Sequence, residues 1–191
     1  KMMVGRDLGD IFNNLDREKN IGETLLQVRN LTSNYVKDIS FELKRGEVLG
    51  FSGLVGSGRT EIMRAIIGAD TVKSGEILLE NNSVICKSPK DAMKKGIVLV
   101  PEDRKTQGIL PNMSVGENIS ISILDNIINK LGFINKKSEE TIAEDGIKKF
   151  NVKTPTAEKK IVELSGGNQQ KTIVARWLAT NPKILILDEP T

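Results

Sequence analysis

The chain has 191 residues, of which 38% are hydrophobic and 28% are charged, a balance typical of a soluble globular protein rather than a disordered or membrane-embedded one. No apolar run approaches the roughly 18 residues that a membrane-spanning helix needs, and no N-terminal stretch has the order of a signal peptide. The net charge of +3 comes from scattered residues, without the basic block that marks a nucleic-acid surface. The single cysteine, Cys86, excludes an internal disulfide and fits a reduced, intracellular location.

The N-terminal part of the chain changes character near residue 24. Residues 1–23 are charged and lack sustained periodicity, so we expect a linker. Beyond it, short apolar runs predict strands, one of them with the alternation of a half-buried strand. Strands are predicted at residues 25–28, 39–43 and 48–51, and as a hairpin at 77–79 and 84–85. A helix is predicted from Thr60 to Ile67, ended by Gly68.

The second half of the chain is mainly helical in pattern. Residues 97–100 predict a buried strand ended by Pro101, and the region of about 103–163 predicts a helical insertion. In it, Ala143, Ile147 and Phe150 share one helix face, and Ser138 is expected to cap that helix. A further helix is predicted at 171–179 and a last buried strand at 184–187. Strands that alternate with helices predict an α/β fold with a parallel core.

The first motif that carries chemistry is GLVGSGRT at residues 53–60. It matches the phosphate-loop pattern G-x-x-x-x-G-K-[ST] except at the lysine, where Arg59 stands. Its glycines allow backbone N–H groups to curl around phosphate oxygens, and Thr60 would bind Mg²⁺. We expect the larger, planar guanidinium of Arg59 to fit this cradle poorly; a glycine-rich turn without a ligand is the alternative. The expected nucleotide contacts are Gly53, Gly56, Ser57, Gly58, Arg59 and Thr60.

Two more motifs precede the end of the chain. ILILDE at 184–189 places Asp188 and Glu189 after a buried strand, at the sheet edge that faces ligands in α/β folds. Asp188 would hold Mg²⁺ and Glu189 would activate water, although a plain acidic turn after a strand is the alternative. LSGGNQQK at 164–171 predicts a helix start with bare N–H groups and the hydroxyl of Ser165, or an ordinary capped helix.

The order GLVGSGRT, VPEDRK, LSGGNQQK and ILILDEPT resembles the ATPase domain of the ATP-binding-cassette (ABC) family, and in particular the second ATPase half of sugar importers of the ribose, xylose and galactose type. The resemblance covers residues 24–191, and residues 2–6 look like the junction after a first half. It implies a phosphate-loop NTPase core with an antiparallel β subdomain and a helical subdomain at about 103–163, truncated after the acidic pair.

In this family two ATPase halves meet head to tail, so that the signature segment of one half contacts ATP on the other. The resemblance therefore implies that this segment serves a partner site, while Arg59 makes the chain's own site degenerate. The signature residues are Leu164, Ser165, Gly166, Gly167, Asn168 and Gln169. Glu102 stands where the family commonly has a glutamine, residues 107–118 are expected near the permease, and Tyr35 is a candidate for stacking on adenine. Trp177 is expected in the core.

The resemblance implies ATP and Mg²⁺ as ligands and a site on the cytoplasmic face of the plasma membrane, as a peripheral subunit. The implied partners are a first ATPase half or a second subunit copy, sugar permease subunits and an extracytoplasmic sugar-binding protein, with no nucleic acid. Two alternatives stay open: a non-transport ABC ATPase, which would need long basic or coiled-coil insertions, and a non-catalytic half that binds nucleotide as a scaffold. Without a histidine, the chain alone is expected to show little or no ATPase activity.

Overall fold

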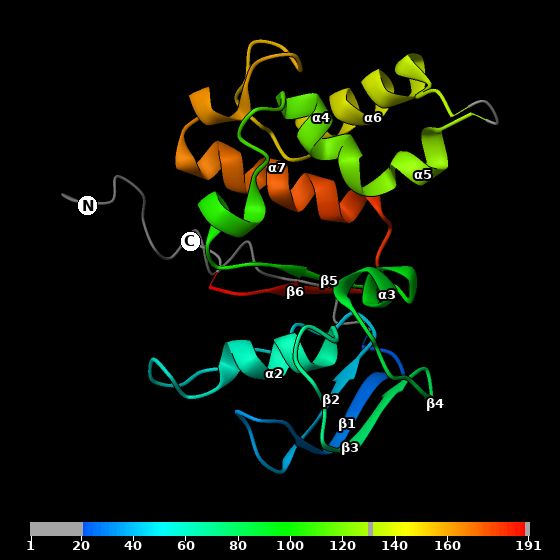
Figure 1. The fold of residues 1–191 in the computed structure, drawn as a ribbon, viewed down its shortest axis with the longest axis vertical. Coiled ribbons are helices and arrows are strands. Elements are labelled where there is room, and N and C mark those ends of the chain that lie inside the picture. The colour runs from blue at the N-terminus through cyan, green and yellow to red at the C-terminus, as the bar shows by residue number, and fades with distance from the viewer. Residues whose placement is uncertain (1–20, 130–131, 190–191) are drawn as a thin grey trace.

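An antiparallel sheet forms one end of the protein in the computed structural model, which describes residues 21–129 and 132–189 (Figure 1). The sheet order is β2-β1-β3-β4. The strands are β1 (Thr24–Thr32), β2 (Ile39–Lys44), β3 (Ser74–Leu79) and β4 (Asn82–Ser83). Inward-facing residues pair across it, as Val28 does with Phe41 and Ile77. This sheet confirms the predicted antiparallel β subdomain.

A two-stranded parallel sheet crosses the middle of the molecule. It pairs β5 (Ile97–Val100) with β6 (Ile184–Leu187) in register, although 83 residues separate the two strands. Helix α2 (Arg59–Ile66) lies between this sheet and the antiparallel one, and α3 (Pro89–Lys94) leads into β5 (Figure 1). The carboxyl ends of β5 and β6 therefore meet at one edge, as the predicted parallel core requires.

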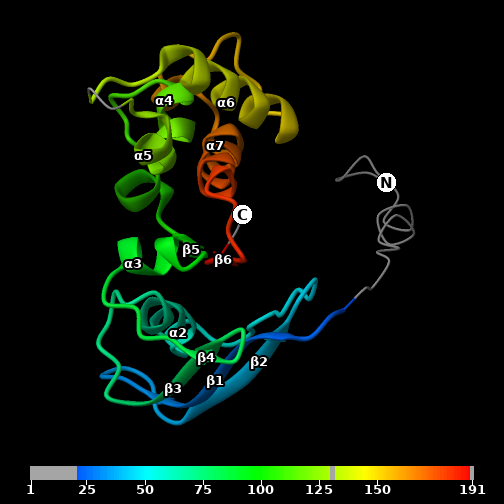
Figure 2. The same ribbon diagram turned by 90° about the vertical axis from the view of Figure 1, so that its right-hand side faces the viewer.

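Helices make up the other end of the molecule (Figure 2). The helices are α4 (Val115–Ser120), α5 (Leu124–Ile127), α6 (Lys136–Lys149) and α7 (Gly166–Ala179), joined by short helical turns at Arg104–Gly108, Ile121–Ile123 and Ile161–Glu163. Figures 1 and 2 both place α7 on the side of β5 and β6 opposite to α2. Helices α4 to α6 and the short helical turns beside them fill the region of about 103–163, which confirms the predicted helical insertion.

The described residues form two separate apolar cores, one under the antiparallel sheet and one among the helices. The larger core packs the inner faces of β1 and β3 against α2, and Ile97 and Ile184 extend it to the parallel strands. The smaller core joins α4, α6 and α7 around Val115 and Ile119, with Ala143 buried and Ile147 and Phe150 packed at its edge. The predicted face of α6 is thus confirmed. Cys86 is half-buried beside the larger core, and burial raises the pKa of its thiol, as expected of a structural cysteine.

Three local predictions were wrong. Residues 48–51 are not a strand, because no described backbone pairs with them, and Val48 is 77% exposed. The hairpin closes earlier than predicted, with residues 82–83 rather than 84–85 as its second strand. Helix α6 begins at Lys136, where Asn135 rather than Ser138 is the cap: the Asn135 side chain accepts a hydrogen bond from the Ser138 backbone N–H. Asparagine caps a helix as well as serine does.

Within the described residues, no helix is both long and apolar enough to cross a membrane. The predicted linker lies almost wholly outside the described residues, as does the junction-like segment at 2–6.

Candidate functional site

The segment at residues 53–60 folds into a tight loop that opens helix α2. The Ser57 N–H donates a hydrogen bond to the Leu54 carbonyl at 3.0 Å, which closes a turn. Gly56 and Gly58 have φ angles of 79° and 89°, values that side chains rarely adopt, and a side chain at Gly58 would also collide with Val36. The loop is therefore curled, as a phosphate cradle requires.

The acidic pair after β6 meets this loop. The Asp188 N–H donates to the Val100 carbonyl at 3.0 Å, which continues the parallel ladder by one residue and fixes the carboxylate at the sheet edge. The Thr60 hydroxyl donates to the Asp188 carboxylate at 3.1 Å. Two motifs 128 residues apart in sequence thus converge, as their combination predicted.

Arg59 and Glu189 form a second link between the same two segments. The Arg59 guanidinium donates to the Glu189 carboxylate at 2.8 Å, and the two side chains are 29% and 43% exposed. An ion pair this exposed contributes only about 0–1 kcal/mol, so a phosphate group could displace Glu189 from Arg59. While this ion pair holds, the Glu189 carboxylate is engaged by Arg59.

The same edge offers oxygen ligands that suit Mg²⁺. The hydroxyl of Thr60 and the carboxylate of Asp188 lie in contact, and Asp188 is 9% exposed. Mg²⁺ prefers such oxygen donors and completes its octahedron with water and substrate phosphates. No cluster of three or more acidic, cysteine or histidine side chains exists within residues 21–129 and 132–189, so the phosphates of a bound nucleotide would complete the set.

The signature segment forms the start of α7. Ser165 occupies the cap position and is exposed, but its hydroxyl accepts from the Asn168 side-chain amide at 2.9 Å instead of from a backbone N–H. The predicted side-chain cap by Ser165 was therefore wrong. Gln169 is buried and donates to the Ile161 and Leu164 carbonyls at 3.3 and 3.2 Å. The Asn168 backbone N–H donates to the Ser165 carbonyl at 2.9 Å. The N–H groups of Gly166 and Gly167 have no hydrogen-bond acceptor among the described residues, as is usual for the first turn of a helix, and they could face an anion.

The two glycine-rich segments belong to different parts of the molecule. The loop at 53–60 opens α2, whereas the signature segment opens α7, on the other side of the β5–β6 pair (Figure 2). In the part of the chain that the structure describes, no hydrogen bond or ion pair joins residues 53–60 to residues 164–169. The chain thus carries two glycine-rich segments that lie apart from each other.

These segments and their sheet edge are features of one protein family. The sequence matches the family model for the ABC transporter over residues 36–191. The chain belongs to the ABC transporter family. Solved ABC cassettes share its fold: CbiO1 from Clostridium perfringens, 28% identical, has a TM-score of 0.70 over 88% of this chain and 66% of its own. A nucleotide-free ABC transporter cassette, 26% identical, has a TM-score of 0.68 over 88% and 70%. The expected ABC-type ATPase fold is confirmed.

Curated ABC relatives are closer in sequence. The ribose import ATP-binding protein RbsA of Oceanobacillus iheyensis is 47% identical over 192 residues, and the arabinose import ATP-binding protein AraG of Mannheimia succiniciproducens is 49% identical over 194. Both alignments cover 100% of this chain and 38% of the relative. The chain thus spans little more than a third of the length of these relatives.

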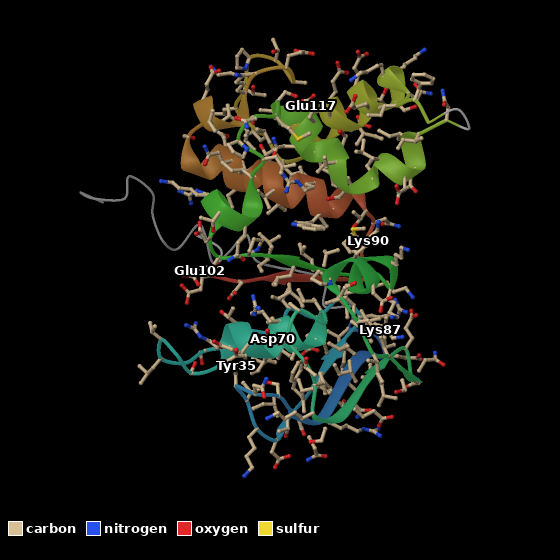
Figure 3. All side chains as sticks on the ribbon, in the orientation of Figure 1. Tyr35, Asp70, Lys87, Lys90, Glu102 and Glu117 are labelled. Carbon is tan, nitrogen blue, oxygen red and sulfur yellow. The ribbon has the colours of Figure 1, made fainter. Side chains whose placement is uncertain are left out.

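Two single residues that the ABC resemblance proposed lie at the edges of the cassette. Tyr35 is 68% exposed and precedes Val36, whose side chain lies next to Gly58 (Figure 3). The pKa of the Arg64 guanidinium on α2 is raised by its hydrogen bond to Asp70 and also by Tyr35, whose side chain therefore lies close to it. Glu102 is exposed just after β5, near the end of β6 (Figure 3). Both positions are compatible with the roles expected of them, which stay predictions.

Three residues were not anticipated correctly from the sequence: Trp177 has a different burial, and Arg104 and Arg176 were given no role. Trp177 is half-buried instead of core, and its Nε1 atom has no hydrogen-bond partner among the described residues. Arg104 and Arg176 were not singled out, yet both side chains pack between α7 and the segment that follows β5. A sequence signal existed for Arg176, because it lies three residues after Ile173, on the buried face of α7.

Proposed function

We propose that the chain is the second ATPase half of a subunit that energises sugar import, with its signature segment serving ATP bound on a partner half. The arrangement of the two glycine-rich segments carries this proposal. A nucleotide on the phosphate loop of one half needs a second surface to cover its terminal phosphate, and the signature segment lies on the wrong side of β5–β6 to provide it within one chain. A head-to-tail pair supplies the missing surface twice.

The chain's own phosphate loop is the degenerate site of this pair. The loop has Arg59 in the lysine position, and the guanidinium donates a hydrogen bond to the Glu189 carboxylate. Arginine is planar and forked where lysine is a compact point charge, so it does not replace the lysine contact with the terminal phosphates. Nucleotide held here would stay bound without efficient hydrolysis, while the partner site turns over.

The partners follow from this role. They are a first ATPase half or a second copy of the subunit, a sugar permease and an extracytoplasmic sugar-binding protein, with ATP and Mg²⁺ as substrate and cofactor. The relatives named as ribose and arabinose import proteins favour a monosaccharide cargo. The subunit would sit on the cytoplasmic face of the plasma membrane, and the segment at 107–118 would lie near the permease.

Two other functions are less well supported. A non-transport ABC ATPase of the kind that acts on DNA or ribosomes would need a basic or coiled-coil arm, whereas the longest helices of the described chain, α6 and α7, have 14 residues each. A purely regulatory half would bind nucleotide but would not need an intact signature segment, and Gly166 and Gly167 open α7 here as the signature pattern requires.

The test is sugar-stimulated ATP hydrolysis by the full-length gene product, assembled with its permease and binding protein in liposomes. Gly167→Asp places a carboxylate where the partner's terminal phosphate would bind, and we expect turnover to fall by about 100-fold, the effect of losing one transition-state contact or more. Glu189→Gln alters the degenerate site, and we expect turnover to stay within about threefold.

Glu140→Gln, an exposed change on α6, is the matched control. Equal losses in the Gly167 and Glu189 variants would show that both sites turn over and would refute the degenerate site. No stimulation of the wild-type complex by any of ribose, arabinose, xylose or galactose would refute the transport role.

A further inference from the structure

Arg176 is a buried arginine without a carboxylate partner among the described residues. It is 6% exposed, on the inner face of α7. Burial lowers the pKa of its guanidinium to about 10, so the group remains charged at neutral pH. A buried charge without a counter-ion is costly unless its donors are well used. The groups that accept hydrogen bonds from Arg176 therefore indicate which part of the chain this side chain fixes.

All three acceptors are neutral, and all three lie between β5 and the end of α4. The Nε and Nη1 atoms of Arg176 donate to the Asn118 and Gly108 backbone carbonyls, each at 2.6 Å, and Nη2 donates to the Asn118 side-chain oxygen at 2.5 Å. Two of these bonds end on backbone atoms. They consequently fix the path of the main chain rather than the rotamer of one side chain.

Asn118 connects Arg176 to the backbone around residue 110. It is fully buried, accepts a hydrogen bond from the Leu110 N–H at 2.9 Å, and donates to the Leu110 and Ser114 carbonyls at 3.1 and 2.9 Å. The loop of residues 108–114 is thus folded around Asn118, and Asn118 is held on α7 by Arg176. Leu110 and its neighbours cannot shift far without disturbing the bonds of Arg176.

The same segment also touches the first turn of α7. The Arg104 guanidinium lies 2.6 Å from where a Cβ atom at Gly166 would stand, so this side chain packs directly against the first turn of α7. Gly108 packs in the same way on Ile173, midway along the helix. The Arg104 side chain makes no hydrogen bond or ion pair with the described residues, and its Nε atom is buried. Residues 104–118 therefore contact α7 along its length, at 166, 173 and 176.

We propose that Arg176 is a positioning residue that makes residues 104–118 and the signature turn of α7 move as one body. When residues 104–118 are displaced, Ser165, Gly166 and Gly167 then move with them, because the rigid helix α7 links Arg176 to the signature turn. The role of the signature turn in this statement rests on the function proposed above. The mechanical tie itself rests only on the contacts of Arg176, Asn118 and Arg104.

The first test measures amide hydrogen exchange in the full-length gene product. Arg176→Met keeps the length of the side chain but removes its donors. We expect exchange to accelerate about tenfold, within the range of coupling effects, at residues 108–118 and at 166–169 together, with β1–β3 unchanged. Arg176→Lys keeps the charge without the planar fork and should give a smaller change at both places. Arg29→Met, at an exposed position of β1, is the control.

The second test separates positioning from folding. In the complex with permease, we expect Arg176→Met to lower kcat for ATP about tenfold and Arg176→Lys to lower it less. Both should leave KM within twofold, since Arg176 is buried inside the helical part of the chain. Faster exchange confined to 108–118, or spread evenly over the chain, would overturn the proposal, as would an unchanged kcat in the folded lysine variant. A wild-type complex without ATPase activity would instead refute the proposed function, and the exchange result would still decide the tie.

Discussion

At the scale of single residues, Arg59 stands where the phosphate-loop pattern has a lysine. This difference changes the chemistry of the loop more than its fold. The loop keeps its curl, and Thr60 still reaches Asp188 at 3.1 Å. What differs is the partner of the positive charge: the Arg59 guanidinium donates to the Glu189 carboxylate at 2.8 Å. In the proposed function, a guanidinium that pairs with Glu189 would be less available to the phosphates of a nucleotide, and it would also occupy the carboxylate.

Arg59→Lys should therefore tighten nucleotide binding at this loop. An ammonium on a flexible stem can approach the terminal phosphates as a point charge, and we expect the dissociation constant of Mg-ATP to fall about tenfold, a change of about 1.4 kcal/mol. Isothermal titration calorimetry of the chain measures it, with Arg45→Lys in the β2 turn as the control, because Arg45 pairs with Glu80 far from the loop. Equal affinities for wild type and Arg59→Lys would contradict the degenerate site.

At the scale of helices and strands, the joint between α4 and α6 is held by a buried carboxylate. Glu139 is 8% exposed and accepts from the Ser120 hydroxyl at 3.0 Å and from Lys136 at 2.9 Å. The Lys136 hydrogen bond, aided by Ser120, holds the pKa of Glu139 below its usual value despite burial. A lowered pKa stabilises the folded state above the ordinary glutamate pKa of about 4.3, and this stabilisation disappears as the pH falls through the folded value.

Glu139→Gln should lower the free energy of unfolding at pH 7 by about 1–3 kcal/mol, the cost of losing hydrogen bonds to a charged group. The difference from wild type should shrink as the pH is lowered from 5 toward 3, because the wild-type carboxyl group then becomes neutral too. Urea unfolding at several pH values measures this. Glu140→Gln, on the exposed face of α6, should change little; a Glu139 effect that does not depend on pH would argue for packing alone.

The elements that the sequence predicted well are those whose own residues determine them. The runs of β5 and β6 were predictable as strands because both are short, wholly apolar and bounded by turns. Residues 48–51 have the same apolar character and still form no strand, since a strand needs a neighbouring backbone that local sequence cannot reveal. In the site, the meeting of Thr60 with Asp188 was predictable from two motifs. The Arg59–Glu189 pair and the buried Arg176 were not, because they depend on side-chain directions across the fold.

At the scale of the whole molecule, the position of the parallel strands decides what one chain can do. The β5–β6 pair separates the glycine-rich loop that opens α2 from the glycine-rich turn that opens α7 (Figures 1 and 2). In the proposed function, these two segments would serve two different sites. The two cores reinforce this division, since one is built around α2 and the other around α4 and α7. Catalysis would then depend on how two such bodies approach each other.

The chain alone should therefore release phosphate from ATP far more slowly than about 1 per second, a low-end enzyme rate. Its phosphate loop lacks a facing signature turn, and Glu189 is engaged by Arg59. Arg59→Lys should raise affinity without restoring turnover, because the second surface remains absent. A phosphate-release assay over a range of chain concentrations measures this, with the full-length gene product as the positive control. A total phosphate-release rate that rises with the square of the chain concentration, with turnover reaching about 1 per second, would show that two copies complete each other's sites. A rate in direct proportion to the concentration, with constant turnover near about 1 per second, would place a whole active site within one chain.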